Sequence, residues 1–482
     1  MSNEPLWTVQ AMAAAMDATP RGPLPATVNG ISIDSRTLAP GAAFFAIKGD
    51  NRDGHEFVPT AREAGAGLCV IAAEQGGRFG QDFPLLMVAD VLGAMRALAR
   101  QARARSRARI VAVTGSVGKT GTKEALRLAL ASQGAQGEAV HASAASYNNH
   151  WGVPLSLCRC PADARFAVFE IGMNHAGEIE PLTRLVRPHV AIVTAIAPVH
   201  LEFFASLEAI ADAKSEIFLG LEPGGAAVIN RDSGQYARLE ANAARMGVAR
   251  IVSFGEHTAA DARLLEWRRQ RDGSFVRARI FDRELTFTLG APGRHLAINS
   301  LAVLATVSLL DADLEASAET LADITAMRGR GGRLVLPVPG GTMTVIDESY
   351  NANPASMRAA LALLGETNGA SPGRRIAVLG DMLELGEHGP DLHRRLAEDI
   401  IADGVELVFC CGPLMKNLWD ALPADRRGSY ATNASELEAH VLAAARAGDI
   451  VMVKGSLGSR MGPIVKALEN RFARAGEAAR AS

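Results

Sequence analysis

One segment combines two glycines, a lysine and a threonine in the order that nucleotide-binding loops use. It reads Ile110-Val-Ala-Val-Thr-Gly-Ser-Val-Gly-Lys-Thr120, between an apolar strand-like run and a stretch with helical periodicity. The glycines let backbone N–H groups turn toward phosphate oxygens, Lys119 can reach the β and γ phosphates, and the Thr120 hydroxyl can hold Mg²⁺. Val113 replaces the first glycine of the strict pattern, so an ordinary turn is the alternative. The predicted ATP-binding residues are Thr114, Gly115, Ser116, Val117, Gly118, Lys119, Thr120 and Gly121.

A carboxylate follows another apolar run of the same region. Glu170 comes directly after residues 166–169, at the carboxyl end of a predicted strand. Open α/β sheets bind ligands at that edge, and a carboxylate there is a hard oxygen ligand suited to Mg²⁺. The alternative is a solvated loop acid. By residue type alone, His200 would be a structural histidine, and Lys214 a surface lysine on a helix predicted from Ser206 to Leu219.

The elements that position these residues alternate between strand and helix patterns. Four apolar runs indicate a parallel sheet with helices on both faces: Ile110-Val-Ala-Val, Phe166-Ala-Val-Phe, Val190-Ala-Ile-Val-Thr and Ala226-Ala-Val-Ile. Residues 262–289 break this rhythm with hairpin-like strands around Asp272-Gly273. A helix is predicted from Val91 to Arg105.

Three composition blocks suggest three domains, residues 1–106, 107–327 and 328–482, with Arg328-Gly-Arg-Gly-Gly-Arg333 as the best linker candidate. A length of 482 residues favours several domains over a single core. The predicted fold class is α/β: a central parallel-sheet domain of the P-loop type, flanked by a small α/β N-terminal domain and a Rossmann-like C-terminal domain.

The overall composition narrows the function classes. The formal net charge is -2, and the five arginines between Arg100 and Arg109 are interpreted as a solvated helix end rather than a nucleic-acid arm. Five cysteines without a C-x-x-C spacing suggest neither a disulfide framework nor a zinc site. No signal-peptide pattern and no apolar stretch of about 18 residues occurs. We therefore expect a cytoplasmic protein that does not insert into membranes.

Several motifs together resemble the Mur ligase family, nearly from end to end. They include Asp34-Ser-Arg36 with Asp53-Gly-His55, Ser146-Tyr-Asn-Asn-His-Trp-Gly-Val-Pro154, Glu170-Ile-Gly-Met-Asn-His175 with Gly177-Glu-Ile179, Ala197-Pro-Val-His200, Ala213-Lys-Ser-Glu-Ile-Phe218 and Asp347-Glu-Ser-Tyr-Asn-Ala-Asn-Pro354. The last motif resembles the family member that adds D-alanyl-D-alanine to UDP-N-acetylmuramoyl-tripeptide. The D-N-P-R motif of the member that adds the third amino acid is absent.

The resemblance implies a two-step reaction. ATP would phosphorylate the substrate carboxylate, and the amine of D-alanyl-D-alanine would then displace phosphate. ATP and Mg²⁺ are the implied cofactors, and a monomer is the family expectation. The implied metal-contacting residues are Thr120, Glu170, His200 and Lys214, the last as a carbamate formed with CO₂ by a neutral amine. Lys119, Glu170, His200 and Lys214 are the predicted catalytic residues.

The resemblance also assigns binding roles outside the central block. The residues expected to bind the UDP substrate are Ser35, Arg36, Lys48, Asp53 and His55, with the arginine giving bidentate contacts to pyrophosphate. Asp347 would bind the ATP ribose, Arg330 the γ phosphate on closure (Arg333 is the alternative), and Tyr350, Asn351 and Asn353 the dipeptide. An Asx-turn before Pro354 is the rival explanation for Asn353.

The sequence departs from the family pattern at two places. Leu296 follows His295 where asparagine is usual, which leaves Asn299 as the expected adenine contact. The segment Lys454-Gly-Ser-Leu-Gly-Ser-Arg460 is followed by Met461-Gly462, without the acidic residue often seen there. Two alternatives stay open: another amide ligase of the family, and a P-loop NTPase switch that binds a partner protein.

Overall fold

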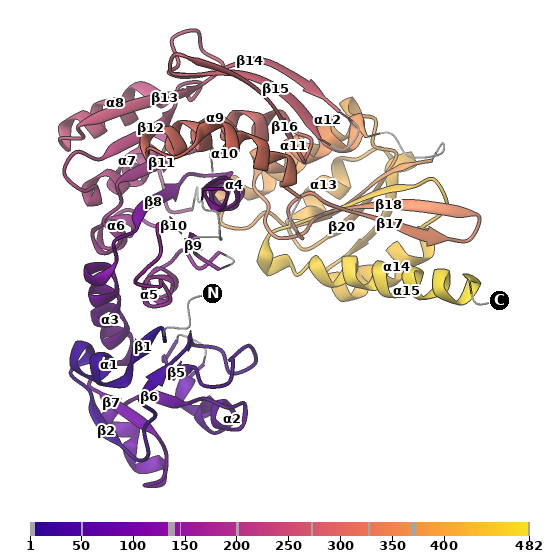
Figure 1. The fold of residues 1–482 in the computed structure, drawn as a ribbon. Coiled ribbons are helices and arrows are strands. Elements are labelled where there is room, and N and C mark those ends of the chain that lie inside the picture. The colour runs from indigo at the N-terminus through magenta and orange to yellow at the C-terminus, as the bar shows by residue number, and fades with distance from the viewer. Residues whose placement is uncertain are drawn as a thin grey trace. The chain divides into compact units, whose positions relative to one another are not determined.

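The computed structural model describes residues 5–49, 52–133, 140–144, 146–198, 202–270, 273–325, 328–367 and 373–480. The chain forms two compact units. One holds residues 1–196 and 210–324, and the other holds residues 197–209 and 325–482. Within these units the strands form three larger sheets and one two-stranded pair, and the α/β class predicted from the sequence is confirmed (Figure 1).

The N-terminal sheet has five short strands. In spatial order they are β2 (Thr19–Arg21), β7 (Leu85–Val88), β6 (Leu68–Ala72), β5 (Ala43–Phe45) and β4 (Ile31–Ser32). The β2–β7 pair is antiparallel and the others are parallel. Strands β1 (Trp7–Thr8) and β3 (Thr27–Val28) form a separate antiparallel pair, and the helices are α1 (Val9–Met16), α2 (Val58–Glu63) and α3 (Val91–Arg105). The bounds of α3 match the predicted helix.

The central sheet has nine strands. In spatial order they are β16 (Arg283–Leu289), β15 (Ser274–Ile280), β14 (Ala262–Arg269), β13 (Arg250–Gly255), β12 (Ala226–Asn230), β11 (Val190–Val193), β8 (Arg109–Thr114), β10 (Phe166–Glu170) and β9 (Val140–Ala142). Strands β8 to β14 pair in parallel, whereas β14, β15 and β16 form the antiparallel hairpins that the sequence predicted. Asp272 of the predicted turn lies outside the described residues.

Helices cover both faces of this sheet. They are α4 (Lys119–Ala131), α5 (Gly152–Cys158), α6 (Ile179–Val186), α7 (Leu207–Ser215), α8 (Tyr236–Arg245), α9 (Arg294–Leu309) and α10 (Leu314–Thr320). A core of aliphatic and phenylalanine side chains joins one sheet face to α4, α9 and α10. Strands buried on both faces explain the continuous apolar runs in the sequence, because neither face can carry polar side chains.

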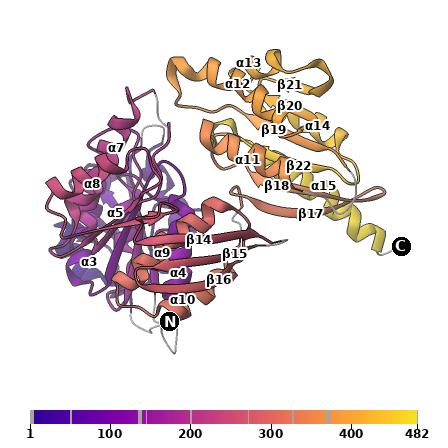
Figure 2. The same ribbon diagram turned by 90° about the horizontal axis from the view of Figure 1, so that it is seen from above.

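The C-terminal sheet has six strands. In spatial order they are β17 (Gly332–Val338), β18 (Gly341–Glu348), β22 (Ile450–Lys454), β19 (Arg375–Gly380), β20 (Leu407–Cys411) and β21 (Arg427–Ala431). Its helices are α11 (Pro354–Glu366), α12 (Gly389–Ala402), α13 (Met415–Ala421), α14 (Ala434–Ala444) and α15 (Gly462–Arg480). Two apolar cores, one with α11 to α13 and one with α14 and α15, give the doubly wound arrangement that the sequence predicted (Figure 2).

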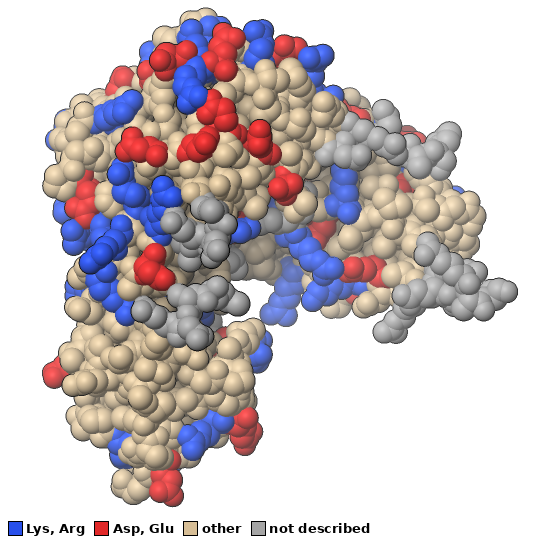
Figure 3. Space-filling view, in the orientation of Figure 1, with Lys and Arg blue, Asp and Glu red and all other residues tan. Residues whose placement is uncertain are grey.

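Two predictions of local structure need correction. The predicted linker at Arg328–Arg333 is only partly a linker, because β17 begins at Gly332 and pairs with β18. The predicted solvated helix end at the basic segment is wrong in its central part, since Arg103 and Arg105 pack inward from α3. Figure 3 shows Lys and Arg side chains gathered over the region of α3 and α6.

Two further expectations from the sequence concern the cysteines and membrane-spanning helices. All five cysteines are buried and unpaired, as expected for residues that only pack. Of the helices in the described part of the chain, none combines the length and the apolar character that crossing a bilayer requires.

Candidate active site

The loop between β8 and α4 has the backbone that phosphate binding needs. Gly115 has φ 147° and Gly118 has φ 88°, values in the region that favours glycine. A Cβ on Gly115 would lie 2.0 Å from Thr194 Oγ1, so the neighbouring strand β11 approaches the loop closely. The Thr194 hydroxyl in turn donates to the carbonyl of Val117 at 2.6 Å. The loop is therefore held from the adjacent strand as well as by its own helix.

The side chains expected to touch ATP lie on or beside this loop. Lys119 opens α4, and its ammonium donates to the Gly115 carbonyl at 2.6 Å. Thr120, the next residue of α4, is buried. A Cβ on Gly118 would lie 2.7 Å from Asn299 Nδ2, so Asn299 of α9, which packs beside α4, reaches the loop. The structure thus brings Asn299 together with the phosphate loop, and its contact with adenine stays a prediction.

The Glu170 carboxylate is buried with one of its two oxygens unsatisfied. It is the last residue of β10, and its side chain is 1% exposed. Oε1 accepts a hydrogen bond from Asn148 Nδ2 at 2.7 Å. Oε2 has no hydrogen-bond partner among the described residues. A buried carboxylate oxygen without a donor is costly unless a cation satisfies it, so this site fits a hard metal ion.

The hydroxyl of Thr120 is the second protein donor expected for Mg²⁺, beside the carboxylate of Glu170. No group of three or more His, Cys, Asp or Glu side chains among the described residues is arranged to hold a metal. Mg²⁺ bound to a nucleotide commonly takes one or two carboxylates, a hydroxyl and phosphate oxygens. Glu170 and Thr120 supply that donor set. His200 lies outside the described residues.

Lys214 is a buried lysine on α7. It is 1% exposed. Burial, and secondarily the positive charge of Lys119, hold the pKa of Lys214 well below its usual value. The prediction of a single helix from Ser206 to Leu219 is corrected here, because α7 ends at Ser215 and a 3₁₀ helix continues over Glu216–Gly220. A lysine in this environment favours the neutral amine that a carbamate requires.

The carboxylate two residues after Lys214 has a structural role that the sequence did not reveal. Glu216 accepts hydrogen bonds from the backbone N–H groups of Gly177, Ile179 and Glu180 at 2.6, 3.1 and 3.1 Å. These N–H groups lie at the start of α6, where a helix has unpaired donors and favours negative charge. Two motifs of the sequence, at 177–179 and 213–218, are thus joined by one side chain.

The residues expected to bind the UDP substrate follow β4 and β5, two adjacent parallel strands. Arg36 is exposed, and its guanidinium donates two hydrogen bonds to the carboxylate of Asp34, at 2.9 and 2.6 Å. These bonds lower the pKa of Asp34. Ser35 is buried between them, and Lys48 is exposed after β5. The position agrees with ligand binding at the carboxyl edge of a sheet.

Both ring nitrogens of His55 make hydrogen bonds within the protein. Its Nε2 accepts the backbone N–H of Ala72 at 3.0 Å, so Nδ1 carries the proton and donates to Asp53 Oδ1 at 2.6 Å. Burial opposes ionisation of Asp53, but the hydrogen bonds from His55 outweigh it and lower the pKa of the carboxyl. With both ring nitrogens used, His55 supports the loop, and Asp53 keeps only its second oxygen for a ligand.

A cavity of about 420 Å³ lies close to these residues within the same unit. Ser32 and Thr37 line it from the N-terminal sheet, and Tyr147 and Arg159 line it from the central domain. Arg159 donates from Nε to the Ile31 carbonyl at 2.7 Å. The sequence analysis missed Arg159, because no local pattern relates it to a strand 128 residues earlier.

In the C-terminal unit the predicted residues lie before β17, at the end of β18 and in the loop after it. Asp347 is buried, and its carboxylate accepts from Gly329 N at 2.8 Å and from the Ser349 hydroxyl at 2.6 Å. The guanidinium of Arg330 lies 4.3 Å from the centre of the Tyr350 ring. Asp347 therefore clamps its own loop, and a carboxylate retains acceptor capacity for a ribose hydroxyl.

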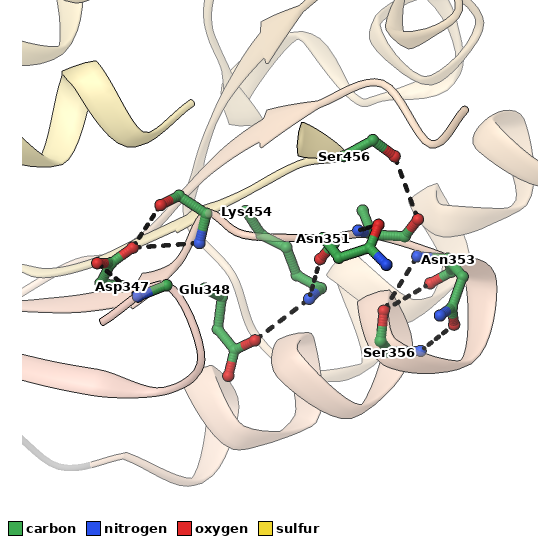
Figure 4. A network of polar contacts seen from close by, with 10 residues as sticks. Asp347, Glu348, Asn351, Asn353, Ser356, Lys454 and Ser456 are labelled. Carbon is green, nitrogen blue, oxygen red and sulfur yellow. Dashed lines mark hydrogen bonds and ion pairs between the residues drawn. The ribbon is translucent and has the colours of Figure 1, made fainter. Parts of the chain in front are cut away.

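The two asparagines of this loop differ in what they leave available. Asn353 is the N-cap of α11: its Oδ1 accepts the Ser356 N–H, and Ser356 Oγ accepts the Asn353 N–H, which makes a capping box (Figure 4). The rival explanation from the sequence was an Asx-turn before Pro354; the oxygen instead caps the start of α11. Asn351 is exposed, and its Oδ1 accepts only the Ala352 N–H among the described residues.

Comparisons with known proteins bear on the whole chain. Three family models match it: "Mur ligase family, catalytic domain" over residues 27–103, "Mur ligase middle domain" over 113–307 and "Mur ligase, glutamate ligase domain" over 332–457. The UDP-N-acetylmuramoyl-tripeptide–D-alanyl-D-alanine ligase of Rickettsia prowazekii (strain Madrid E) is 33% identical over 437 residues, 91% of this chain and 94% of its own. The chain belongs to the Mur ligase family.

Further similarities extend this assignment. The same-named ligase of Escherichia coli (strain K12) is 33% identical to this Mur ligase and covers 92% of the chain and 94% of its own length. A crystal structure of MurF from Acinetobacter baumannii matches with a TM-score of 0.80 and 26% identity, over 97% of this chain and 99% of that one. The family resemblance inferred from the motifs is confirmed, and so is the three-domain Mur ligase fold.

Proposed function

We propose that this Mur ligase joins D-alanyl-D-alanine to UDP-N-acetylmuramoyl-tripeptide at the expense of ATP. The product is the UDP-muramoyl pentapeptide used in peptidoglycan synthesis. The observation that carries the choice of substrates is the similarity to curated ligases of that name along more than 90% of both chains. The motif at 347–354, which resembles that of the ligase using the same substrates, agrees with this choice.

The proposed chemistry has two displacement steps. First, an oxygen of the substrate carboxylate attacks the γ phosphorus, a P–O bond forms, and ADP leaves. Then the dipeptide amine attacks the acyl carbon, the C–N bond forms, phosphate leaves with the bonding electrons of the C–O bond, and the amine loses a proton. Lys119 and the N–H groups of the loop stabilise charge on the γ phosphate. The orphan oxygen of Glu170 and the hydroxyl of Thr120 would hold Mg²⁺, which neutralises phosphate charge when bound.

The buried lysine supports a second part of the proposal. Since the pKa of Lys214 is held low, its neutral amine can add to CO₂ and release a proton, giving a carbamate. The carbamate would supply an anionic oxygen beside the phosphate loop. Incubation with ¹³CO₂ should give a carbamate carbon signal in the wild type and none in Lys214→Met. A signal unchanged in that variant would contradict the assignment to Lys214.

Phosphate release tests the reaction directly. With ATP, Mg²⁺ and UDP-muramoyl tripeptide, release should require D-alanyl-D-alanine, and the product should gain the mass of the dipeptide less one water. Release with a single amino acid in place of the dipeptide would indicate another amide ligase of the family. Steady hydrolysis without either peptide substrate would indicate an NTPase switch. The cytoplasmic location and the monomeric state remain predictions, which fractionation and sedimentation can check.

A further inference from the structure

Three loops meet at one edge of the C-terminal sheet. Strands β18, β22 and β19 are neighbours and run parallel, so the segments that follow them lie side by side. The loop after β18 carries Asn351, the residue expected to bind the dipeptide. The segment Lys454-Gly-Ser456 at the end of β22 lies between this loop and the one after β19. The reaction proposed above gives this middle segment no role.

Lys454 binds the loop after β18 through its side-chain ammonium. It is the last residue of β22, directly across from Glu348 of β18, and its side chain is 2% exposed. Nζ donates to the Asn351 carbonyl at 3.0 Å and to Glu348 Oε2 at 3.2 Å (Figure 4). Burial lowers the pKa of Lys454, and the carboxylate of Glu348 acts in the opposite direction. Burying an ammonium group costs free energy because it loses its hydration, and the two hydrogen bonds offset that cost.

Ser456 forms hydrogen bonds both to the loop after β18 and to the loop after β19. Its hydroxyl donates to the Ala352 carbonyl at 3.2 Å (Figure 4) and accepts the backbone N–H of Leu383, after β19, at 3.0 Å. The Ser456 N–H also donates to the Asp381 carbonyl at 3.0 Å. One short segment therefore holds both flanking loops through directed hydrogen bonds.

Close packing explains the glycine between these two residues. A Cβ on Gly455 would lie 2.6 Å from Met461 Cγ and 3.1 Å from the Gly380 Cα. The chain after β22 thus approaches the end of β19 more closely than a side chain allows. This approach lies beside the contacts that Ser456 makes with Asp381 and Leu383 in the loop after β19.

We propose that Lys454 and Ser456 are positioning residues for the dipeptide: by holding the carbonyls of Asn351 and Ala352, they fix the Asn351 side chain in the orientation that binds D-alanyl-D-alanine. This inference rests on the proposed function. Because the two residues act on consecutive peptide groups, loss of either one frees the loop at a single point. The contacts of this network involve neither the phosphate loop nor the UDP-substrate residues.

The test is a comparison of Michaelis constants in full-length variants. Lys454→Met keeps an unbranched apolar side chain of similar length in the buried site, and Ser456→Ala removes only the hydroxyl. Each should raise the KM for D-alanyl-D-alanine about tenfold, the loss expected for one buried hydrogen bond to a charged or constrained group. The KM values for ATP and for the UDP-tripeptide should change by less than about twofold. Ser456→Thr, which retains a hydroxyl, should recover most of the dipeptide KM.

A matched control separates positioning from general stability. Arg374, which is partly exposed, and the buried Asp449 form an ion pair at 2.7 Å just before β19 and β22, at the opposite ends of these strands. Arg374→Met should lower the unfolding midpoint at least as much as Lys454→Met and leave the dipeptide KM unchanged. A purely structural role for Lys454 would make the two variants alike in all three KM values.

The outcomes distinguish this inference from the proposed function. If the wild type does not use the dipeptide at all, the proposed function fails. If the wild type uses it and the KM for the dipeptide stays within about twofold in both Lys454→Met and Ser456→Ala, only the inference fails. Equal rises in all three KM values would also overturn it. If Lys454→Met does not fold, Ser456→Ala and Ser456→Thr decide the matter alone.

Discussion

At the scale of single residues, the proposed chemistry depends on two buried groups. One is a carboxylate oxygen that lacks a hydrogen-bond donor, and the other is a lysine whose pKa is lowered. The Glu170 carboxylate has one oxygen bound to Asn148 and one buried oxygen without a donor among the described residues. Lys214 is buried near Lys119 and has a depressed pKa. Such arrangements cost stability, and folds retain them where chemistry requires them.

Glu170→Gln should separate the charge of this residue from its packing. The amide oxygen of glutamine can still accept from Asn148, so the unfolding midpoint should not fall. The turnover number should drop about 100-fold or more, because the charge that holds the cation is lost. Kinetics at several Mg²⁺ concentrations would measure this loss. Glu180→Gln is the control, since Glu180 is paired with Arg184 on the exposed face of α6; equal losses in both variants would contradict the role of Glu170.

At the scale of elements, α3 is fastened by arginines that point inward. Arg103 donates to the carbonyls of Val186 and Arg187 and to the carboxylate of Glu222. The Arg105 guanidinium lies 3.4 Å from the centre of the Trp7 ring. The end of α3 is thus part of the packing between the N-terminal sheet and the central sheet within the first unit.

Arg103→Ala should destabilise the first unit by about 3 kcal/mol, because one buried and two partly buried acceptors lose their donor. Urea unfolding followed by circular dichroism measures this change. Arg100→Ala, on the exposed face of the same helix, should change stability by less than about 0.5 kcal/mol. Equal effects at the two positions would mean that charge rather than buried contacts holds α3 in place.

The edge strand β9 should make stability depend on pH. Burial lowers the pKa of His141 to about 4, and its Nε2 lies 2.8 Å from the Ser156 carbonyl oxygen. The unfolded chain binds a proton near pH 6.5 that the folded chain takes up only near pH 4, so stability falls as the pH drops through this window. The ring keeps some exposure, so the loss should be roughly 1–2 kcal/mol. Unfolding midpoints at pH 7.5 and 5 should differ less in His141→Gln than in the wild type; an unchanged difference would contradict this.

The sequence predicted those features that depend on neighbours along the chain. The phosphate loop, the bounds of α3 and the hairpins after residue 262 follow from local periodicity and glycine spacing. The contacts of Arg103, Arg159 and Lys454 span 83 to 128 residues, and no local pattern encodes them. The sequence predicted a local Asx-turn as the alternative role of Asn353, and the structure shows a different local role, the cap of α11. The contact between Ser456 and Ala352 spans 104 residues and was not predicted.

At the scale of the whole molecule, each of the three sheets presents residues for one proposed ligand after its parallel strands. Ser35 and Arg36 follow β4, the phosphate loop follows β8, and Asn351 follows β18. This recurrence has a common physical cause, because the carboxyl ends of parallel strands bring loops together at one edge. Each of these sheets can therefore hold its own proposed ligand at the carboxyl edge of its strands.

The measurement that tests the central claim most directly is the mass of the product formed from UDP-muramoyl tripeptide, ATP and D-alanyl-D-alanine. The proposed function predicts one new species, heavier than the tripeptide substrate by the dipeptide less one water, in amounts equal to the phosphate released. Phosphate released without this species, or the same product from a single amino acid, would contradict it.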